Sequence, residues 1–182
     1  MMQKTYILDT NVYGELLLEK NSEKLIENIN KDDSVYIYGI DIIEKELQET
    51  PVEAKYKSKL MKELVMNIYE SIIKEELTLV PIAQYIASEY YKKFDELRKS
   101  GRYYKSLSPK IDKYKEEDLN VDFQIIAVAS LRNVDIVVST DKRTILSEIA
   151  EDTYKRINTL NGLRTPRLVT YSEFKRRYSH EK

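Results

Sequence analysis

Short segments rich in Val, Ile, Thr and Tyr alternate with longer segments of helical apolar spacing, and this alternation limits the folds open to the 182-residue chain. Strands that alternate with helices form a parallel sheet covered by helices on both faces. We therefore expect an α/β fold, a three-layer α/β/α sandwich, rather than an eight-stranded barrel, which usually needs about 250 residues. The expected strands are Thr5–Leu8, Val35–Tyr38, Thr78–Pro81, Asp135–Ser139 and Arg167–Thr170.

Apolar residues at helical spacing fill the intervals between these strands. The first helical segment is expected to break near Asn21-Ser22, and a later helix is expected to open at Asp122, with Phe123 as its first residue. No repeat, low-complexity tract or Gly/Ser linker divides the chain. These features predict a single domain, 1–182, with an enlarged helical and charged connector at about 51–119.

The composition excludes several kinds of chemistry. The chain has no Cys and one His, His180, so a thiol nucleophile, a thiolate zinc site and a Ser-His-Asp triad are not expected. Only four Gly are present, and neither glycine-rich phosphate-loop motif occurs. The formal net charge is −1, so any binding to nucleic acid must be local. Catalysis would then depend on carboxylates, Lys or Arg, hydroxyls or a hard metal ion.

Apolar runs are short throughout the sequence. None approaches the roughly 18 residues that a membrane span needs. The N-terminal segment also reaches an Asp before the apolar stretch of a signal peptide could form. We expect a soluble, cytoplasmic protein without a membrane partner.

Four acids from distant segments are predicted to meet at the carboxyl edge of the sheet, where open α/β sheets bind ligands. Asp9 and Asp141 directly follow the first and fourth strands. Glu46 lies within the first two turns of the helix after the second strand, and Asp122 opens the helix that precedes the fourth. Because like charges at short distance destabilise a fold unless a cation intervenes, a divalent ion is expected among them. Mg²⁺ or Mn²⁺ suits such oxygen ligands, and the expected reaction is hydrolysis of a phosphodiester.

At these residues the sequence resembles the PIN-domain family of metal-dependent ribonucleases. The matching motifs are YILDTNV (Tyr6–Val12), IIEKEL (Ile42–Leu47), VDFQIIAVAS (Val121–Ser130), VVSTDKRT (Val137–Thr144) and RLVTYSEF (Arg167–Phe174). The resemblance implies a five-stranded parallel sheet in the order 3-2-1-4-5 and a Mg²⁺- or Mn²⁺-dependent endoribonuclease. Family members include toxins of toxin–antitoxin pairs and enzymes that process ribosomal RNA.

The resemblance also implies a role for individual residues. Asp9, Glu46, Asp122 and Asp141 would be the metal ligands and catalytic acids. Thr10, Asn11 and Thr140 would support them by orienting carboxylates and bound water. RNA is the expected substrate, a homodimer is an expected assembly, and an antitoxin would be the partner if the protein is a toxin.

Several alternatives remain open. IIEKEL contains two acids, so Glu44 is the alternative to Glu46. Each Asp could serve only as a turn residue or a helix N-cap. A phosphatase of the haloacid-dehalogenase type would need a second Asp where Asn11 stands. A further alternative is a catalytically inactive PIN-like domain that binds RNA or protein.

A basic connector at Arg98–Lys115 combines cations with interleaved tyrosines. Cations bind phosphates and tyrosines stack on unpaired bases, as single-stranded nucleic-acid sites require. The alternative is a solvated loop with ordinary charges. The candidate RNA contacts are Arg102, Lys105, Lys110 and Lys113.

Overall fold

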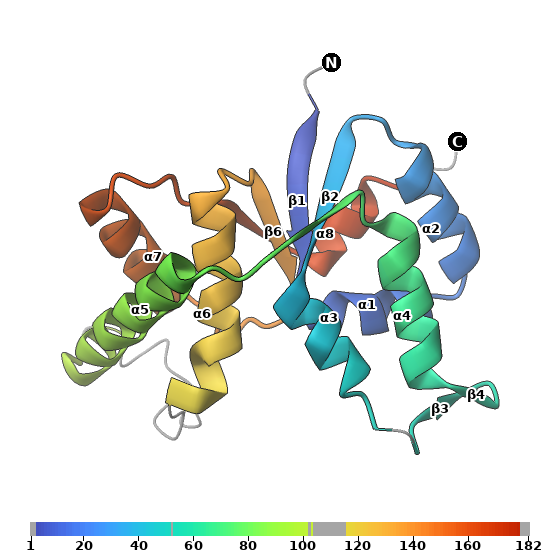
Figure 1. Ribbon diagram of the computed structural model, residues 1–182, viewed down its shortest axis with the longest axis horizontal. Coiled ribbons are helices and arrows are strands. Elements are labelled where there is room, and N and C mark those ends of the chain that lie inside the picture. Colours follow the sequence, from blue (N-terminus) through green and yellow to red (C-terminus); the bar gives the residue numbers. More distant parts are fainter. Residues whose placement is uncertain (1–2, 52, 102, 104–115, 179–182) are drawn as a thin grey trace. The chain divides into compact units, whose positions relative to one another are not determined.

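The structure is a computed structural model, and it describes residues 3–51, 53–101, 103 and 116–178 (Figure 1). It is an α/β protein with a five-stranded parallel sheet flanked by helices, which confirms the predicted fold class. The elements in chain order are β1 (Lys4–Leu8), α1 (Thr10–Leu18), α2 (Ser22–Lys31), β2 (Val35–Ile40), α3 (Asp41–Gln48), β3 (Lys55–Tyr56), β4 (Lys59–Leu60), α4 (Met61–Ile72), β5 (Glu75–Leu77), α5 (Pro81–Lys99), α6 (Glu116–Leu131), β6 (Ile136–Ser139), α7 (Glu148–Leu160), β7 (Arg167–Thr170) and α8 (Tyr171–Arg176).

The strand order of the main sheet is β5-β2-β1-β6-β7. Counted along the chain, these five strands have the order 3-2-1-4-5, as predicted; the labels differ because the short antiparallel hairpin β3–β4 lies between β2 and β5. Lys4 of β1 is opposite Val35 of β2, and Ile40 of β2 is opposite Leu77 of β5, both in parallel register. The carboxyl ends of these strands therefore lie at one edge.

Two expected boundaries are wrong. The predicted strand Thr78–Pro81 is not a strand: β5 is Glu75–Leu77, and the chain leaves the sheet because Pro81 begins α5, where its fixed φ and missing N–H are tolerated. Asp122 does not open a helix. Helix α6 begins at Glu116, and Leu119 is buried within the additional turns.

The chain folds into two compact units. The first contains 1–78, 138–140 and 169–182, and the second contains 79–137 and 141–168. The carboxyl-terminal residues of β6 and β7 thus belong to the first unit. The prediction of a single domain stays a prediction.

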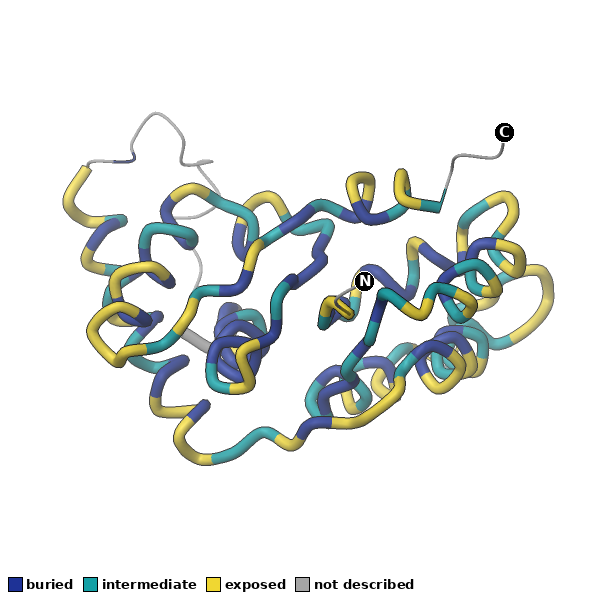
Figure 2. The backbone as a smooth tube through the Cα atoms, turned by 90° about the horizontal axis from the view of Figure 1, so that it is seen from above, coloured by how far each residue is buried: buried dark blue, intermediate teal, exposed yellow. Residues whose placement is uncertain are grey.

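In the first unit, helix α4 packs against α1, α2 and α3 (Figure 1). The core beneath them contains Ile7, Leu8, Leu16 and Ile43, none of which is exposed. The predicted helix break is confirmed, because α1 ends at Leu18 and Asn21 precedes α2. Most helices present buried residues on one side and exposed residues on the other, as amphipathic helices do (Figure 2), whereas residues 123–130 of α6 are all buried.

The second unit is built around an aromatic cluster from α5, α6 and α7. Phe123 makes edge-on contacts with Tyr90, Phe94 and Tyr154 at centroid distances of 6.2, 5.6 and 5.9 Å. The Asn158 side chain accepts a hydrogen bond from the Tyr90 hydroxyl at 2.5 Å, so that buried phenol has a polar partner. These contacts pack α5, α6 and α7 against one another.

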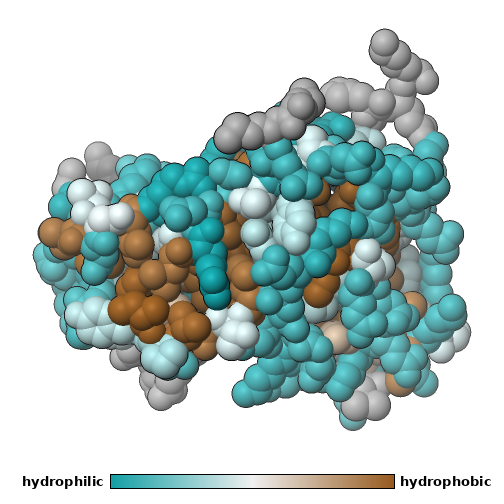
Figure 3. All heavy atoms as spheres, turned by 45° about the horizontal axis from the view of Figure 1, so that its top comes forward, coloured by the Kyte–Doolittle hydropathy of each residue, from teal (hydrophilic) through white to brown (hydrophobic). Residues whose placement is uncertain are grey.

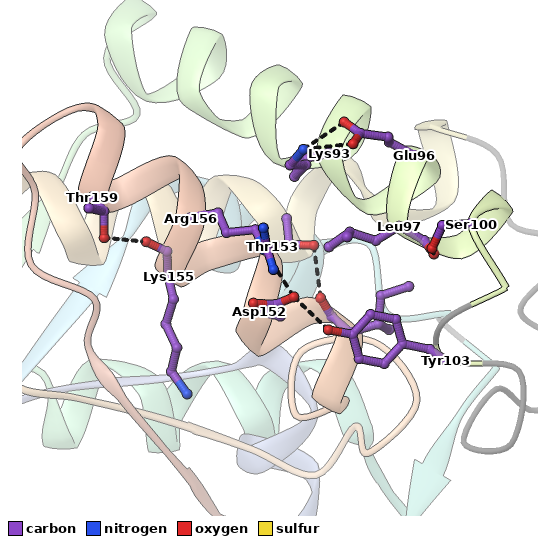
Figure 4. A network of polar contacts seen from close by, with 11 residues as sticks. Lys93, Glu96, Leu97, Ser100, Tyr103, Asp152, Thr153, Lys155, Arg156 and Thr159 are labelled. Atoms are coloured by element: carbon purple, nitrogen blue, oxygen red, sulfur yellow. Dashed lines mark hydrogen bonds and ion pairs between the residues drawn. The ribbon is translucent and has the colours of Figure 1, made fainter.

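A polar contact fixes Tyr103, four residues beyond the end of α5, to α7 (Figure 4). Its hydroxyl donates to Asp152 Oδ2 at 2.5 Å, and Arg156 Nε lies 3.0 Å from the same oxygen. Tyr103 is buried, although the chain on either side of it carries many charges. The start of the basic connector is thereby anchored to the second unit.

The face of the molecule drawn in Figure 3 is largely hydrophilic, with apolar residues gathered over part of the second unit. The exposed large hydrophobic residues include Ile82, Tyr85 and Leu160 in that unit and Leu18 at the end of α1. Among the described helices, none combines the length and the apolar character that crossing a membrane demands.

Gly39 provides a test of the packing between β2 and α4. A Cβ at Gly39 would lie 2.3 Å from the Tyr69 hydroxyl oxygen, whereas a Cβ at Gly14 in α1 would meet no atom within 4 Å. We expect Gly39→Ala to lower the free energy of unfolding by about 1–3 kcal/mol through overpacking. The control, Gly14→Ala, should raise it by roughly 0.5–1 kcal/mol because Ala is the better helix former. Urea unfolding of both variants measures the two changes. If Gly39→Ala were as stable as Gly14→Ala, the Tyr69 side chain would move aside at no energetic cost, and the expected overpacking would be contradicted.

Candidate metal centre at the end of strand β1

Asp9 directly follows β1 and precedes α1, so it lies at the carboxyl edge of the sheet. Its backbone is extended, with φ −62° and ψ 153°, as at a helix N-cap, but its side chain makes no capping hydrogen bond. Its backbone N–H instead donates to the Val138 carbonyl of β6 at 2.9 Å, which continues the pairing with the neighbouring strand. The strand end therefore positions this carboxylate, and a capping role does not explain it.

The Asp9 carboxylate is buried, with 2% of the residue exposed. The Ser139 hydroxyl at the end of β6 donates to Asp9 Oδ2 at 2.8 Å. Ser139 is itself fully buried, so this hydrogen bond is shielded from water. The contact holds the orientation of the carboxylate between the two neighbouring strands.

Burial raises the pKa of Asp9 from 3.8 to about 6. The hydrogen bond from Ser139 opposes this rise, as do the Thr10 backbone N–H and the Asn11 side chain, whereas the charge of Glu46 adds to it. Desolvation is the largest of these effects, because a carboxylate ion loses its hydration when it is buried. The site thus holds an acid whose ionised form needs a positive partner.

Glu46 lies in α3 and is hydrogen-bonded to Thr10, the residue that follows Asp9. The Thr10 hydroxyl, in the first residue of α1, donates to Glu46 Oε2 at 2.5 Å. Thr10 and Glu46 are half-buried. Among the described residues no Lys, Arg or His forms an ion pair with Asp9 or Glu46. Asp9 and Glu46 therefore lie near each other with no basic counter-ion among the described residues.

The other acid of the IIEKEL motif points to a different neighbourhood. Glu44 accepts a hydrogen bond from Gln48 Nε2 at 3.1 Å, one turn along the same helix. Glu44 also raises the pKa of Tyr69 and is not among the groups that shift the pKa of Asp9. The geometry therefore groups Glu46, not Glu44, with Asp9.

The other two predicted acids, Asp122 and Asp141, belong to the second unit. Asp122 is half-buried in the second turn of α6. Asp141 Oδ1 accepts from the backbone N–H groups of Arg143 and Thr144 at 2.7 and 3.2 Å, and therefore stabilises the turn after β6. Their predicted role as metal ligands stays a prediction.

The remaining predicted residues have separate outcomes. The Asn11 side chain lowers the pKa of Asp9, so it does contact the site. Thr140 is half-buried between Ser139 and Asp141, and its supporting role stays a prediction. The proposed RNA contacts Arg102, Lys105, Lys110 and Lys113 lie outside the described residues.

Two residues near Asp9 were missed from the sequence. Ser139, which the sequence analysis did not single out, contacts the acid; the signal was its position at the end of a strand predicted to lie beside the first. Tyr13 is fully buried one turn into α1, and its hydroxyl has no hydrogen-bond partner among the described residues. Burial and the charge of Asp9 raise the pKa of Tyr13.

The residues in this locality fit a hard divalent cation. Asp9 offers a buried carboxylate without a basic partner, and Glu46 offers a second one nearby. Oxygen ligands of this kind suit Mg²⁺ and Mn²⁺, which commonly bind through one or two carboxylates and retain several waters. Within the described part of the chain, no group of three or more His, Cys, Asp or Glu side chains is placed to hold a metal ion.

The fold and this locality define the chain as an α/β protein with paired carboxylates at the carboxyl edge of a parallel sheet. No model of a known protein family matches the sequence, and no curated protein matches it. Among solved structures, the chain is similar to VapBC2 from Rickettsia felis, crystallised bound to a DNA fragment from the promoter. The TM-score is 0.49 and the sequence identity 17%, over 91% of this chain and 98% of that chain. This likeness assigns no role to any side chain described above.

The raised pKa of Asp9 predicts a pH dependence of stability. Below about pH 3 the carboxyl is largely protonated in both the folded and the unfolded chain, so it carries no cost. As the pH rises to about 6 the unfolded chain ionises first, and the folded state loses stability of order 2–3 kcal/mol. Asp9→Asn should therefore be more stable than the wild type above pH 6, with a difference that shrinks toward pH 4.

Urea unfolding in EDTA between pH 4 and pH 8 measures this difference. Glu44→Gln is the control, because that acid lies outside the Asp9 locality. An Asp9→Asn protein that is less stable than the wild type by the same amount at every pH would contradict the assignment of the buried charge.

Proposed function

We propose that the protein is a PIN-like, metal-dependent endoribonuclease that hydrolyses RNA phosphodiester bonds. The observation that carries the proposal is the buried Asp9 carboxylate, held by Ser139 and placed beside Glu46 without a basic counter-ion among the described residues. Natural proteins retain a buried charge of this kind where a ligand or a reaction requires it. The order of the acidic motifs along the chain supports the same proposal.

Each residue of the locality has a definite task in this proposal. Asp9 and Glu46 bind the cation, Ser139 orients Asp9, and the Thr10 hydroxyl orients Glu46. The cation, Mg²⁺ or Mn²⁺, would supply an activated water and offset negative charge at the scissile phosphate. Burial excludes water from Asp9 and so strengthens its attraction for a cation. Asp122 and Asp141 are proposed as further ligands on the basis of their motifs.

Cleavage of a labelled RNA by purified protein tests the catalytic proposal. We expect activity with Mg²⁺ or Mn²⁺, none with EDTA, and a loss of roughly a hundredfold or more for Asp9→Asn and Glu46→Gln. Ser139→Ala should lose roughly tenfold to a hundredfold, because it only orients Asp9. Glu44→Gln, two residues from Glu46 in the same helix, is the matched control and should retain wild-type activity.

The same assay separates the alternatives. Wild-type rates in Asp9→Asn would contradict catalysis at this site. Equal losses in Glu44→Gln and Glu46→Gln would contradict the choice between the two acids. RNA binding without cleavage at any metal concentration would favour the second candidate, a catalytically inactive PIN-like domain that binds RNA or protein.

The proposed partners are tested separately. An antitoxin would be a small protein encoded beside this one, and co-expression should suppress the RNA cleavage if the protein is a toxin. A homodimer should give twice the monomer mass of 21.5 kDa in light scattering. A processing role in place of a toxin role would leave the activity without such an inhibitor.

A further inference from the structure

Two adjoining hollows lie in the first unit around the turn between α1 and α2. The larger, about 870 Å³, is bounded by this turn, the β3–β4 hairpin and α4, and the smaller, about 290 Å³, lies between the turn and α8. They share Glu19, Lys20, Asn21 and Lys24, so they form one continuous surface. We call the two hollows together the lysine groove.

The lysine groove lies away from the candidate metal centre. Asp9 immediately precedes α1, whereas Leu17 and Glu19, at the other end of the helix, line the groove. At the rise of an α-helix these nine residues span roughly 13 Å. The groove is therefore a separate feature of the first unit.

The charge of the groove is opposite to that of the metal centre. Five lysines and two glutamates line it, although the whole chain has a net charge of −1. Lys175 Nζ lies 2.6 Å from Glu19, so one glutamate is already neutralised. Among the described residues no acid forms an ion pair with Lys20, Lys57 or Lys59. The groove thus keeps a local positive field, which attracts a polyanion.

The β3–β4 hairpin carries cations and an aromatic ring to the rim. The Lys57 ammonium lies 5.1 Å from the centroid of the Tyr56 ring, and Lys59 pairs with Tyr56 across the hairpin. Lys57 and Ser58 form its two-residue turn with φ of 48° and 68°, a left-handed conformation that favours glycine. This turn holds the Lys57 side chain beside the Tyr56 ring at the rim of the groove.

The other lining groups suit nucleotides better than an acidic peptide. Leu17, Leu64 and Ile68 form an apolar floor, and amides and hydroxyls at Asn21 and Asn67 and at Ser22 and Ser71 can hydrogen-bond to base edges. The smaller hollow repeats the set of residue types with Tyr178, Asn28 and Lys175. Lysine for phosphates, tyrosine for stacking and amides for base edges are the features of sites for single-stranded RNA.

We propose that the lysine groove binds a single-stranded segment of RNA, at a distance from the cleavage site. The proposal rests on the proposed function, because it adds a second contact for the RNA that the metal centre would cleave. Two hollows in series, each with a tyrosine and lysines, suit a strand rather than a single nucleotide. The groove would determine which RNAs are held long enough to be cut.

Fluorescence polarisation with a labelled ten-nucleotide uridylate strand tests the proposal. Measurements in EDTA on an Asp9→Asn background separate binding from cleavage. Lys57→Gln with Lys59→Gln should weaken the affinity about tenfold and reduce the salt slope by about 1.4, since each lost phosphate contact removes about 0.7. Tyr56→Ala should weaken it by roughly fivefold or more through lost stacking. Lys20→Gln, which lies outside the hairpin, should weaken it even if the hairpin variants lose local structure.

The matched control is Lys92→Gln with Lys155→Gln, two exposed lysines on α5 and α7 that remove the same charge outside the groove. It should bind within about twofold of the parent. Equal losses of affinity in the control and groove variants, or no loss in the groove variants, would overturn the proposal. Neither result would bear on the proposed cleavage at the metal centre. Full competition by uridine monophosphate at equal nucleotide concentration would assign the groove to free nucleotides, and tighter binding of polyglutamate would assign it to acidic peptides.

Discussion

The burial of the Asp9 carboxylate is the constraint around which the carboxyl edge of the sheet is arranged. A charged group removed from water costs several kcal/mol unless hydrogen bonds or a cation compensate it. Ser139 and the residues that follow Asp9 provide the hydrogen bonds, yet burial still raises the pKa to about 6. The nearby Glu46 adds repulsion. A divalent cation would offset both, so the cost of folding this edge and the proposed catalysis have a common physical origin.

Helix α1 connects two surfaces of opposite character in the first unit. Its amino-terminal end adjoins two carboxylates, and its carboxyl-terminal end lines the lysine groove. A net charge of −1 for the chain conceals this separation. An RNA strand requires both kinds of surface, since cations hold its phosphates while bound metal ions promote cleavage. The two proposals are therefore compatible, and separate measurements of cleavage and of binding test them.

Topology was the most predictable part of the structure. The alternation of strands and helices predicted the sheet, and Asp9 was placed correctly because an acid directly follows an apolar strand. Boundaries were less predictable: Thr78–Pro81 has strand-like residues, but Pro81 favours the first turn of a helix. Asp is a common N-cap, so the sequence predicts a helix start at Asp122, whereas α6 in fact begins at Glu116 and includes the buried Leu119.

Contacts between side chains could not be predicted from the sequence. The choice between Glu44 and Glu46 depends on which of them reaches Thr10, and the role of Ser139 depends on how two strand ends meet in register. The positive φ values of Lys57 and Ser58 could not be predicted from the sequence either, because neither residue is Gly or Asn, which usually occupy such turns. Periodicity predicts which face of an element is buried, but it does not determine the rotamers that build a site.

A crystal of the full chain soaked in Mn²⁺ tests the central claim most directly, because the anomalous signal locates the ion independently of any activity. We predict a peak at coordination distance from carboxylate oxygens of both Asp9 and Glu46, and no such peak in a crystal of the Asp9→Asn protein. Full Mn²⁺ occupancy elsewhere, with the Asp9 carboxylate bound only to Ser139 and its neighbours, would contradict it.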